Sequence, residues 1–237
     1  MHSCNVSLLQ YPRKLKGLFE ELYDVSLIED RVKALSEVER EVRECRKCRL
    51  WTTRTKPVPG HGNPNAEVML IGEAPGYNED LEGKPFVGAA GKFLDQLLAL
   101  GELKRSDVFI TNVLKCRPPN NRDPLPDEVE ACTPYLDRQV AIIKPKVIIC
   151  LGRHSASYVL SKAGVKGHMR HGYVSISAIR GQVFNVSYGG LKVMVIPTYH
   201  PAAGLYNPKL KKVIMEDFVM IGRILRGIRS GSISLTN

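Results

Sequence analysis

Residues that could take part in catalysis gather in one acidic, glycine-rich stretch, GEAPGYNEDLEGKPFVGAAG (72–91), directly after the apolar run AEVMLIG (66–72). This stretch is not a phosphate-binding loop. Both GxxxxGK[ST] and GxGxxG are absent from it, and its acidic side chains would repel a phosphate. Carboxylates at this position could instead hold a water molecule or stabilise developing positive charge. The stretch therefore indicates either a site that holds a water molecule or one that stabilises positive charge as it develops on a substrate.

Polar residues follow each of four apolar runs that we expect to be strands: 66–72, 107–114, 146–152 and 192–201. Helices are predicted over residues 27–45, 90–101, 126–143, 154–164 and 208–228. The alternation predicts an α/β three-layer sandwich, with a central four-stranded, mainly parallel sheet and helices on both faces. Ligands of such sheets bind at the carboxyl ends of the strands, so the polar segments that follow the strands are expected to form one site.

The charge balance favours a polyanionic partner. Lysine and arginine number 34 against 24 acidic residues, which gives a net charge of +10. Nucleic acid is the simplest partner of such a chain, although many basic proteins bind none. No apolar run is long enough to span a membrane and no secretion signal precedes the first helix, so we expect a cytoplasmic protein.

Four of the six cysteines are spaced as metal ligands could be. Cys45 and Cys48 form a CxxC pair, Cys116 follows the second strand, and Cys132 lies in a predicted helix. By spacing alone, a zinc ion, a 4Fe–4S cluster and unliganded buried thiols all remain open. We expect Cys150 in the core and Cys4 as a free terminal thiol.

Two long motifs, 72–95 and 110–132, and the short motif HPA (200–202) resemble the family 4 uracil-DNA glycosylases. The resemblance covers residues 38–227. It implies a uracil-DNA glycosylase domain over 31–230 with an N-terminal extension over 1–30. It also implies a structural 4Fe–4S cluster on Cys45, Cys48, Cys116 and Cys132, and no cofactor in the chemical step.

The resemblance assigns roles to three residues around a flipped-out uracil. Phe86 would stack on the base, Asn112 would read its edge, and His200 would donate to uracil O2 as negative charge grows there. Each has a plain structural alternative: a core phenylalanine, a strand-end turn residue and a structural histidine.

The carboxylate that acts on the sugar or the water is less clearly indicated. Several branches of the superfamily place a water-activating Asp where this chain has Ala74, so Glu73 becomes the first candidate and Ala74 a base-contacting residue. Glu79 and Asp80 are further candidates, with a solvated loop or a hydrogen bond that braces the loop as the alternative. Tyr77 or Glu79 would exclude the methyl group of thymine, because the position that carries a Tyr in some branches is Gly76 here.

DNA contacts are predicted from residues around the same edge, with a solvated basic surface as the alternative: Lys115, Arg117, Arg122 and Arg153. Leu205 is the predicted wedge into the DNA, within a segment where relatives often carry two leucines. The segment 165–181 is longer than in compact relatives. We expect it to be a surface hairpin, with His168, Arg170 and His171 as less favoured DNA contacts.

These observations favour a monofunctional uracil-DNA glycosylase of base-excision repair. The alternatives are a non-catalytic Fe–S nucleic-acid-binding protein on the same fold and a nucleotide-handling α/β enzyme. Uracil-containing DNA, single- or double-stranded, is the expected partner, and the chain is expected to be a monomer. The family's association with the sliding clamp makes that a further candidate partner, although QYPRKLKGLF (10–19) matches a clamp-binding peptide poorly.

Overall fold

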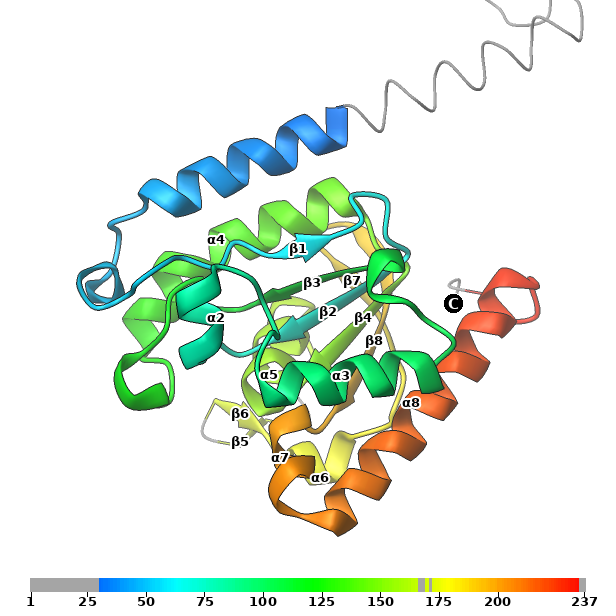
Figure 1. Ribbon diagram of the computed structural model, residues 1–237. Helices are drawn as coiled ribbons and strands as arrows, with labels where there is room; N and C mark the ends of the chain where they lie inside the picture. Colours follow the sequence, from blue (N-terminus) through cyan, green and yellow to red (C-terminus); the bar gives the residue numbers. More distant parts are fainter. Residues whose placement is uncertain (1–29, 166–168, 171, 235–237) are drawn as a thin grey trace, which may run out of the picture.

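The computed structural model describes residues 30–165, 169–170 and 172–234. Its centre is a six-stranded sheet of order β1-β3-β2-β4-β8-β7 (Figure 1). Four adjacent strands are parallel: β2 (Val68–Gly72), β3 (Val108–Asn112), β4 (Val147–Leu151) and β8 (Leu191–Thr198). The first three are buried along their whole length, as expected for parallel strands covered on both faces. The α/β class and the four parallel strands are confirmed.

The sheet has six strands rather than four because an antiparallel strand borders each edge. β1 (His61–Gly62) pairs with β3, and β7 (Phe184–Tyr188) pairs with β8. β1 has only two residues, and burial alternates along β7, so neither shows the continuous apolar run that revealed the others.

Alternate residues of the strands face two separate apolar cores. One core packs beneath α3 (Ala89–Leu100) and α8 (Pro208–Arg229), and the other beneath α4 (Pro126–Ile143) and α5 (Arg153–Lys162). The β2–α3–β3 crossover thus covers one face, and the β3–α4–β4 crossover covers the other. This reversal beside β2 opens a crevice at the carboxyl ends of the strands.

A third apolar cluster joins the helix over residues 30–44 to α4. It includes Val38 and Val42 from that helix, Leu50 from η2 (Arg49–Thr52), and Tyr135 from α4. Figure 1 shows the two helices side by side, and Arg138 of α4 donates to Glu41 at 2.6 Å. Cys45, Cys48, Cys116 and Cys132 belong to the same cluster.

Several short elements were not predicted: α2 (Tyr77–Glu82), η3 (Arg105–Asp107), η4 (Pro119–Asn121), α6 (Ile176–Ile179) and α7 (Pro201–Tyr206). Part of the acidic stretch is therefore helical, and so is the segment after His200. β5 (Met169–Arg170) and β6 (Tyr173–Val174) pair antiparallel, in agreement with the predicted hairpin. His168, His171 and nearly all of the predicted extension lie outside the described residues. Within the described part of the chain, no helix is long and apolar enough to cross a membrane.

Candidate active site

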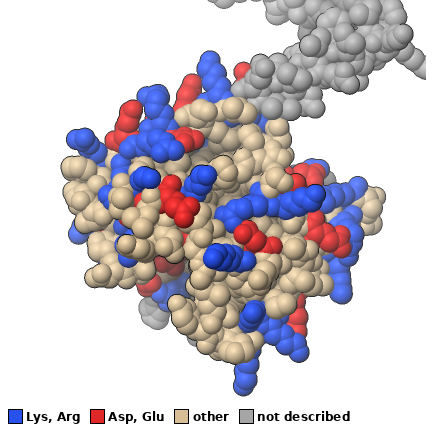
Figure 2. Space-filling view, viewed as in Figure 1, with Lys and Arg blue, Asp and Glu red and all other residues tan. Residues whose placement is uncertain are grey.

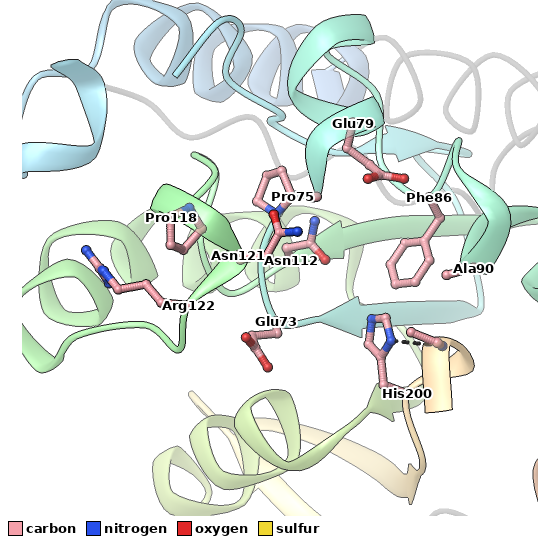
Figure 3. Close-up of a pocket in the computed structure, with 13 residues that line it drawn as sticks. Glu73, Pro75, Glu79, Phe86, Ala90, Asn112, Pro118, Asn121, Arg122 and His200 are labelled. Carbon is pink, nitrogen blue, oxygen red and sulfur yellow. Dashed lines mark hydrogen bonds between the residues drawn. The ribbon is translucent and has the colours of Figure 1, made fainter. Parts of the chain in front are cut away.

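A cavity of about 330 Å³ opens at the carboxyl edge of the sheet (Figure 3). It is lined by residues that follow β2, β3 and β8 and by the segment leading into α3. Most of the predicted catalytic and substrate-binding residues lie in this lining: Glu73, Ala74, Glu79, Phe86, Asn112 and His200. The cavity is also lined by residues that were not predicted from the sequence: Pro75, Ala90, Pro118, Asn121 and Ala202.

Asn112 ends β3 and is only 1% exposed. Among the buried side-chain oxygens and nitrogens of the described residues, its Oδ1 is the one atom without a hydrogen-bond partner. An unsatisfied buried acceptor costs about 1–3 kcal/mol, so its presence in a cavity wall points to a ligand that donates. Gly72 provides the space, because a Cβ there would lie 2.3 Å from Oδ1.

Phe86 forms the apolar wall of the cavity in a constrained backbone conformation. Its φ is 52°, in the left-handed region, and its ring is stacked with that of His200 at 5.5 Å. Arg105 holds the conformation by donating to the carbonyl of Phe86 at 2.8 Å. A Cβ on Gly91 would lie 1.9 Å from the same carbonyl oxygen, so only glycine fits there. Such strain is typical of residues fixed for binding.

His200 is oriented by the first turn of α7. Its Nδ1 accepts the backbone N–H of Ala202 at 3.1 Å, which leaves Nε2 to carry the ring proton in the neutral form. Burial lowers the pKa of His200 to about 4. His200 is therefore a neutral donor near pH 7.

Glu73 directly follows β2, and Figure 3 shows its carboxylate directed away from Phe86. Burial, reinforced by the negative charge of Asp123, raises the pKa of Glu73 to about 7, whereas Arg153 acts in the opposite direction. His154 Nε2 lies 3.6 Å from Glu73 and 3.4 Å from Asp123. Arg153 donates to the same nitrogen at 3.1 Å and also pairs with Asp123.

The Asp123–Arg153–His154 group around Glu73 was not predicted as a unit. Burial lowers the pKa of His154, whereas the nearby Asp123 acts in the opposite direction. The only signal in the sequence was position, because His154 and Arg153 directly follow the third predicted strand. Asp123 comes from the segment before α4, which no local pattern connects with Glu73.

Glu79 and Asp80 both brace the chain around α2. Glu79 accepts the backbone N–H groups of Val87 and Gly88 at 2.9 Å each, and Asp80 accepts that of Thr55 at 2.9 Å. The bracing alternative is thus confirmed for both, although Glu79 also lines the cavity.

Tyr77 is 57% exposed, lies outside the cavity lining and is covered by Arg117 at 5.1 Å. Its predicted role in substrate binding is therefore not supported.

The four predicted metal ligands line a second, small cavity between η2 and α4. Burial raises the pKa of Cys132 to about 12, so the free thiol is neutral. Arg54 donates to Cys116 Sγ and the backbone of Lys115 donates to Cys132 Sγ, both at 3.1 Å. Such donors suit sulfur that carries negative charge.

The spacing of these thiols bears on the kind of metal group. Sulfur atoms around one zinc ion lie about 3.8 Å apart, given Zn–S bonds of about 2.3 Å. In the described part of the chain, one group of potential metal ligands has all its ligand atoms within 4.8 Å of one another: Glu73, Asp123 and His154. The four thiols do not form such a group. No three of the four thiols therefore lie as close together here as the sulfur ligands of one zinc ion would.

Comparison of the sequence with known proteins relates the chain to the uracil-DNA glycosylases. The model described as "Uracil DNA glycosylase superfamily" matches residues 59–219. A Type-4 uracil-DNA glycosylase of Sulfurisphaera tokodaii is 55% identical over 190 residues, which cover 79% of this chain and 83% of that protein. This chain belongs to the type-4 uracil-DNA glycosylase family. The Type-4 enzyme of Archaeoglobus fulgidus is 50% identical (81% and 94% covered), and that of Thermotoga maritima is 42% identical (76% and 88% covered).

Most of the predicted DNA contacts of this type-4 family member lie at or near the surface, whereas Lys115 does not. Arg117, Arg122 and Arg153 are partly exposed. Each has an acceptor partner, which is Asn121, the buried Glu128 and Asp123, respectively. Leu205, on α7, is 42% exposed, and its neighbour Tyr206 is 88% exposed. Figure 2 shows Lys and Arg side chains spread over one face of the molecule, with acidic side chains between them.

Lys115 does not reach the surface. It is 1% exposed, and its Nζ donates to Thr111, Asn112 and Gln139 at 2.6–2.8 Å. Burial lowers the pKa of Lys115 to about 7, and the neighbouring Cys132 and Cys116 act in the opposite direction. The prediction that Lys115 contacts DNA is wrong.

Proposed function

We propose that this protein is a monofunctional uracil-DNA glycosylase of base-excision repair, which hydrolyses the N-glycosidic bond of a uracil turned out of DNA. The observation that carries the proposal is the partnerless Asn112 Oδ1 in the cavity wall, beside the stacked rings of Phe86 and His200. Uracil offers an N3–H donor beside a carbonyl oxygen. A single amide can satisfy both, with Oδ1 accepting from N3–H and Nδ2 donating to O4.

The reaction places negative charge on the departing base and positive charge on the sugar. Nε2–H of His200 donates to uracil O2 as that charge grows, and Phe86 stacks on the base. Glu73, in its carboxylate form, stabilises the cationic sugar or orients the attacking water. Backbone N–H groups around Ala74 contribute to holding the base.

Discrimination against thymine falls to Glu79 in this proposal. A Cβ on Gly76 would lie 2.8 Å from Glu79 Oε2, so the Glu79 carboxylate fills the space beside Gly76. Its two backbone donors fix it there, where the methyl group of thymine would meet it.

In this proposal the four cysteines bind a 4Fe–4S cluster, which has a structural role. Cys45 and Cys48 follow the helix over residues 30–44, Cys116 follows β3, and Cys132 lies in α4. Bound there, the group would tie that helix to the glycosylase core, and the glycosidic step needs no electron transfer.

The partner in this proposal is uracil-containing DNA, bound through Arg117, Arg122 and Arg153 with Leu205 as the wedge. A monomeric state and a cytoplasmic location stay predictions. The segment for a sliding-clamp partner, 10–19, lies outside the described residues.

The test uses a labelled oligonucleotide with one uracil, in single- and double-stranded form, and a matched oligonucleotide with thymine at that position. The expected result is strand cleavage at the uracil only after alkali treatment, and none at thymine. Binding of either DNA without any base release, by protein with its metal group intact, would favour the non-catalytic alternative. Cleavage without alkali would contradict a monofunctional enzyme.

A further inference from the structure

Arg105 holds the segment that carries Phe86 from outside the base cavity. Its Nη2 donates to Pro85 O at 2.6 Å and to Phe86 O at 2.8 Å, and its Nη1 donates to Asp95 Oδ1 at 2.6 Å. Arg105 belongs to η3, which directly precedes β3, and Asp95 belongs to α3. Arg105 is not among the residues that line the base cavity. One guanidinium therefore ties two consecutive carbonyls of this segment to α3.

A cation suits this position because two carbonyl oxygens converge on one nitrogen atom. Oxygen atoms that face the same point repel each other, and a charged donor offsets that repulsion more strongly than a neutral one. The guanidinium has five N–H groups in a fixed plane, and three of them are used here. The ion pair with Asp95 fixes the orientation of that plane.

A carboxylate holds the same segment by its amide groups. Glu79 Oε1 accepts the backbone N–H groups of Val87 and Gly88 at 2.9 Å each. An anion thus binds the N–H groups of the segment, while the Arg105 cation binds its carbonyls. Between these contacts Phe86 has a φ of 52°, in the left-handed region that a bulky side chain rarely adopts. Such a conformation persists only where the surrounding contacts fix it.

Packing alone does not fix the position of this segment. Phe86 lines the base cavity and also a second cavity of about 880 Å³, whose lining includes Val87 and Arg105. The segment therefore borders free space into which it could shift. The ring, however, has a defined place, because it stacks with His200 at 5.5 Å, and a Cβ on Gly72 would lie 2.9 Å from it.

We propose that Arg105 is a positioning residue for base stacking, because it holds the carbonyls of Pro85 and Phe86 and so keeps the Phe86 ring where it stacks on the flipped-out uracil. The inference rests on the proposed function, in which Phe86 is the stacking ring. It predicts that Arg105 affects the rate of uracil release without contacting the base, and that this effect passes through the ring of Phe86.

The test is a double-mutant cycle read by single-turnover uracil release. Arg105→Met removes the donors and should release uracil at least about 10-fold more slowly, with unchanged affinity for the thymine-containing oligonucleotide. In a Phe86→Leu background there is no ring to position, so the same change should cost less than about 2-fold further. Equal losses in the two backgrounds would overturn the proposal, and so would an unchanged rate in Arg105→Met.

Two further arginine variants serve as controls. Arg105→Lys keeps a cation with three donors and should retain at least about a third of the wild-type rate. Arg226→Met removes an exposed ion pair with Glu102 and should release uracil at the wild-type rate. If Arg105→Met does not fold, Asp95→Ala replaces it, because the guanidinium then loses its anchor on α3. Asp95→Ala should slow release by about 3-fold in the wild type and not in Phe86→Leu, and an unchanged rate would count against the proposal.

The position of the ring can also be measured without activity, by ¹⁹F NMR of protein labelled with 4-fluorophenylalanine. The chain has six phenylalanines, and the signal of Phe86 is the one lost in Phe86→Leu. Arg105→Met should shift or broaden this signal, whereas Arg226→Met should not. An unchanged Phe86 signal in Arg105→Met would overturn the proposal. Wild-type protein that releases no uracil refutes the proposed function instead, and the spectrum still tests whether Arg105 holds the ring.

Discussion

Asn112 and Gly72 form one functional unit at the scale of single residues. They lie opposite each other in the β2–β3 register, and the missing side chain of Gly72 leaves room for the amide that Asn112 presents. The folded protein leaves the Asn112 oxygen without a partner, at a cost of about 1–3 kcal/mol. Binding of a base with an N–H donor removes that cost, so the affinity for the correct base includes it.

Glu73 predicts the pH dependence of catalysis. The carboxylate is the active form and its pKa is about 7, so the single-turnover rate should rise tenfold per pH unit below 7 and level off above it. His200, with a pKa of about 4, stays neutral across this range and adds no change of its own. The measurement is uracil release between pH 5 and 9 under single-turnover conditions.

Glu73→Gln is the matched variant for that profile. It should be slower by about 100-fold at pH 8 and nearly independent of pH. A Gln variant with the pH profile of the wild type would assign the titration to another group.

The carboxyl ends of β2 and β3 act together at the scale of secondary structure elements, and Gly72→Ala tests this. The added Cβ would lie 2.3 Å from Asn112 Oδ1 and 2.9 Å from the Phe86 ring, so it displaces both base-contacting groups. Uracil release should fall by about 100-fold or more while the protein stays folded.

Gly101→Ala, in the turn after α3, is the control for this substitution. Its added Cβ would come no closer than 3.3 Å to a neighbouring atom. It should release uracil at nearly the wild-type rate. Full activity in Gly72→Ala would show that the space between Gly72, Asn112 and Phe86 is not as narrow as the structure indicates.

The elements that could be predicted from the sequence are those with an apolar or helical pattern along most of their length. The four parallel strands are mostly apolar along their length. The helix α4 has the bounds predicted for it, starting at Pro126 and ending at Ile143. β1 and β7 lie at the sheet edges, where pairing through the backbone needs little apolar sequence. α2 and α7 are six residues each, too short for a helical period to show.

The site residues divide in the same way. Glu73 directly follows β2, Asn112 ends β3, and His200 comes shortly after the end of β8, so their convergence was predictable from the topology alone. Lysine is rarely buried, and the burial of Lys115 depends on Gln139 of α4, so no local pattern could predict it. The approach of Asp123 to Glu73 likewise depends on packing between distant segments.

At the scale of the whole molecule, the net charge of +10 predicts strongly salt-dependent DNA binding. Affinity for the uracil oligonucleotide should fall by at least about 10-fold between 50 and 200 mM salt. Arg117→Ala should reduce the slope of log K against log salt by about one. Filter binding or fluorescence anisotropy across this salt range gives both values.

Arg226→Ala provides the control at this scale. Arg226 lies in the last turn of α8 and pairs with Glu102, beyond the end of α3 that lies away from the cavity. Its removal should leave the slope unchanged. Equal slopes for Arg117→Ala and the wild type would remove Arg117 from the DNA interface.

The most direct test of the central claim, that Asn112 reads a flipped-out uracil in this cavity, compares Asn112→Ala with Asn121→Ala. Both asparagines line the cavity, but Asn121 accepts from Arg117, whereas Asn112 Oδ1 has no partner. The measurement is the single-turnover rate of uracil release at saturating enzyme, with DNA affinity recorded in parallel. The account predicts a loss of about 100-fold or more in Asn112→Ala, less than about 5-fold in Asn121→Ala, and similar DNA affinity for both. Comparable rates in the two variants would contradict it.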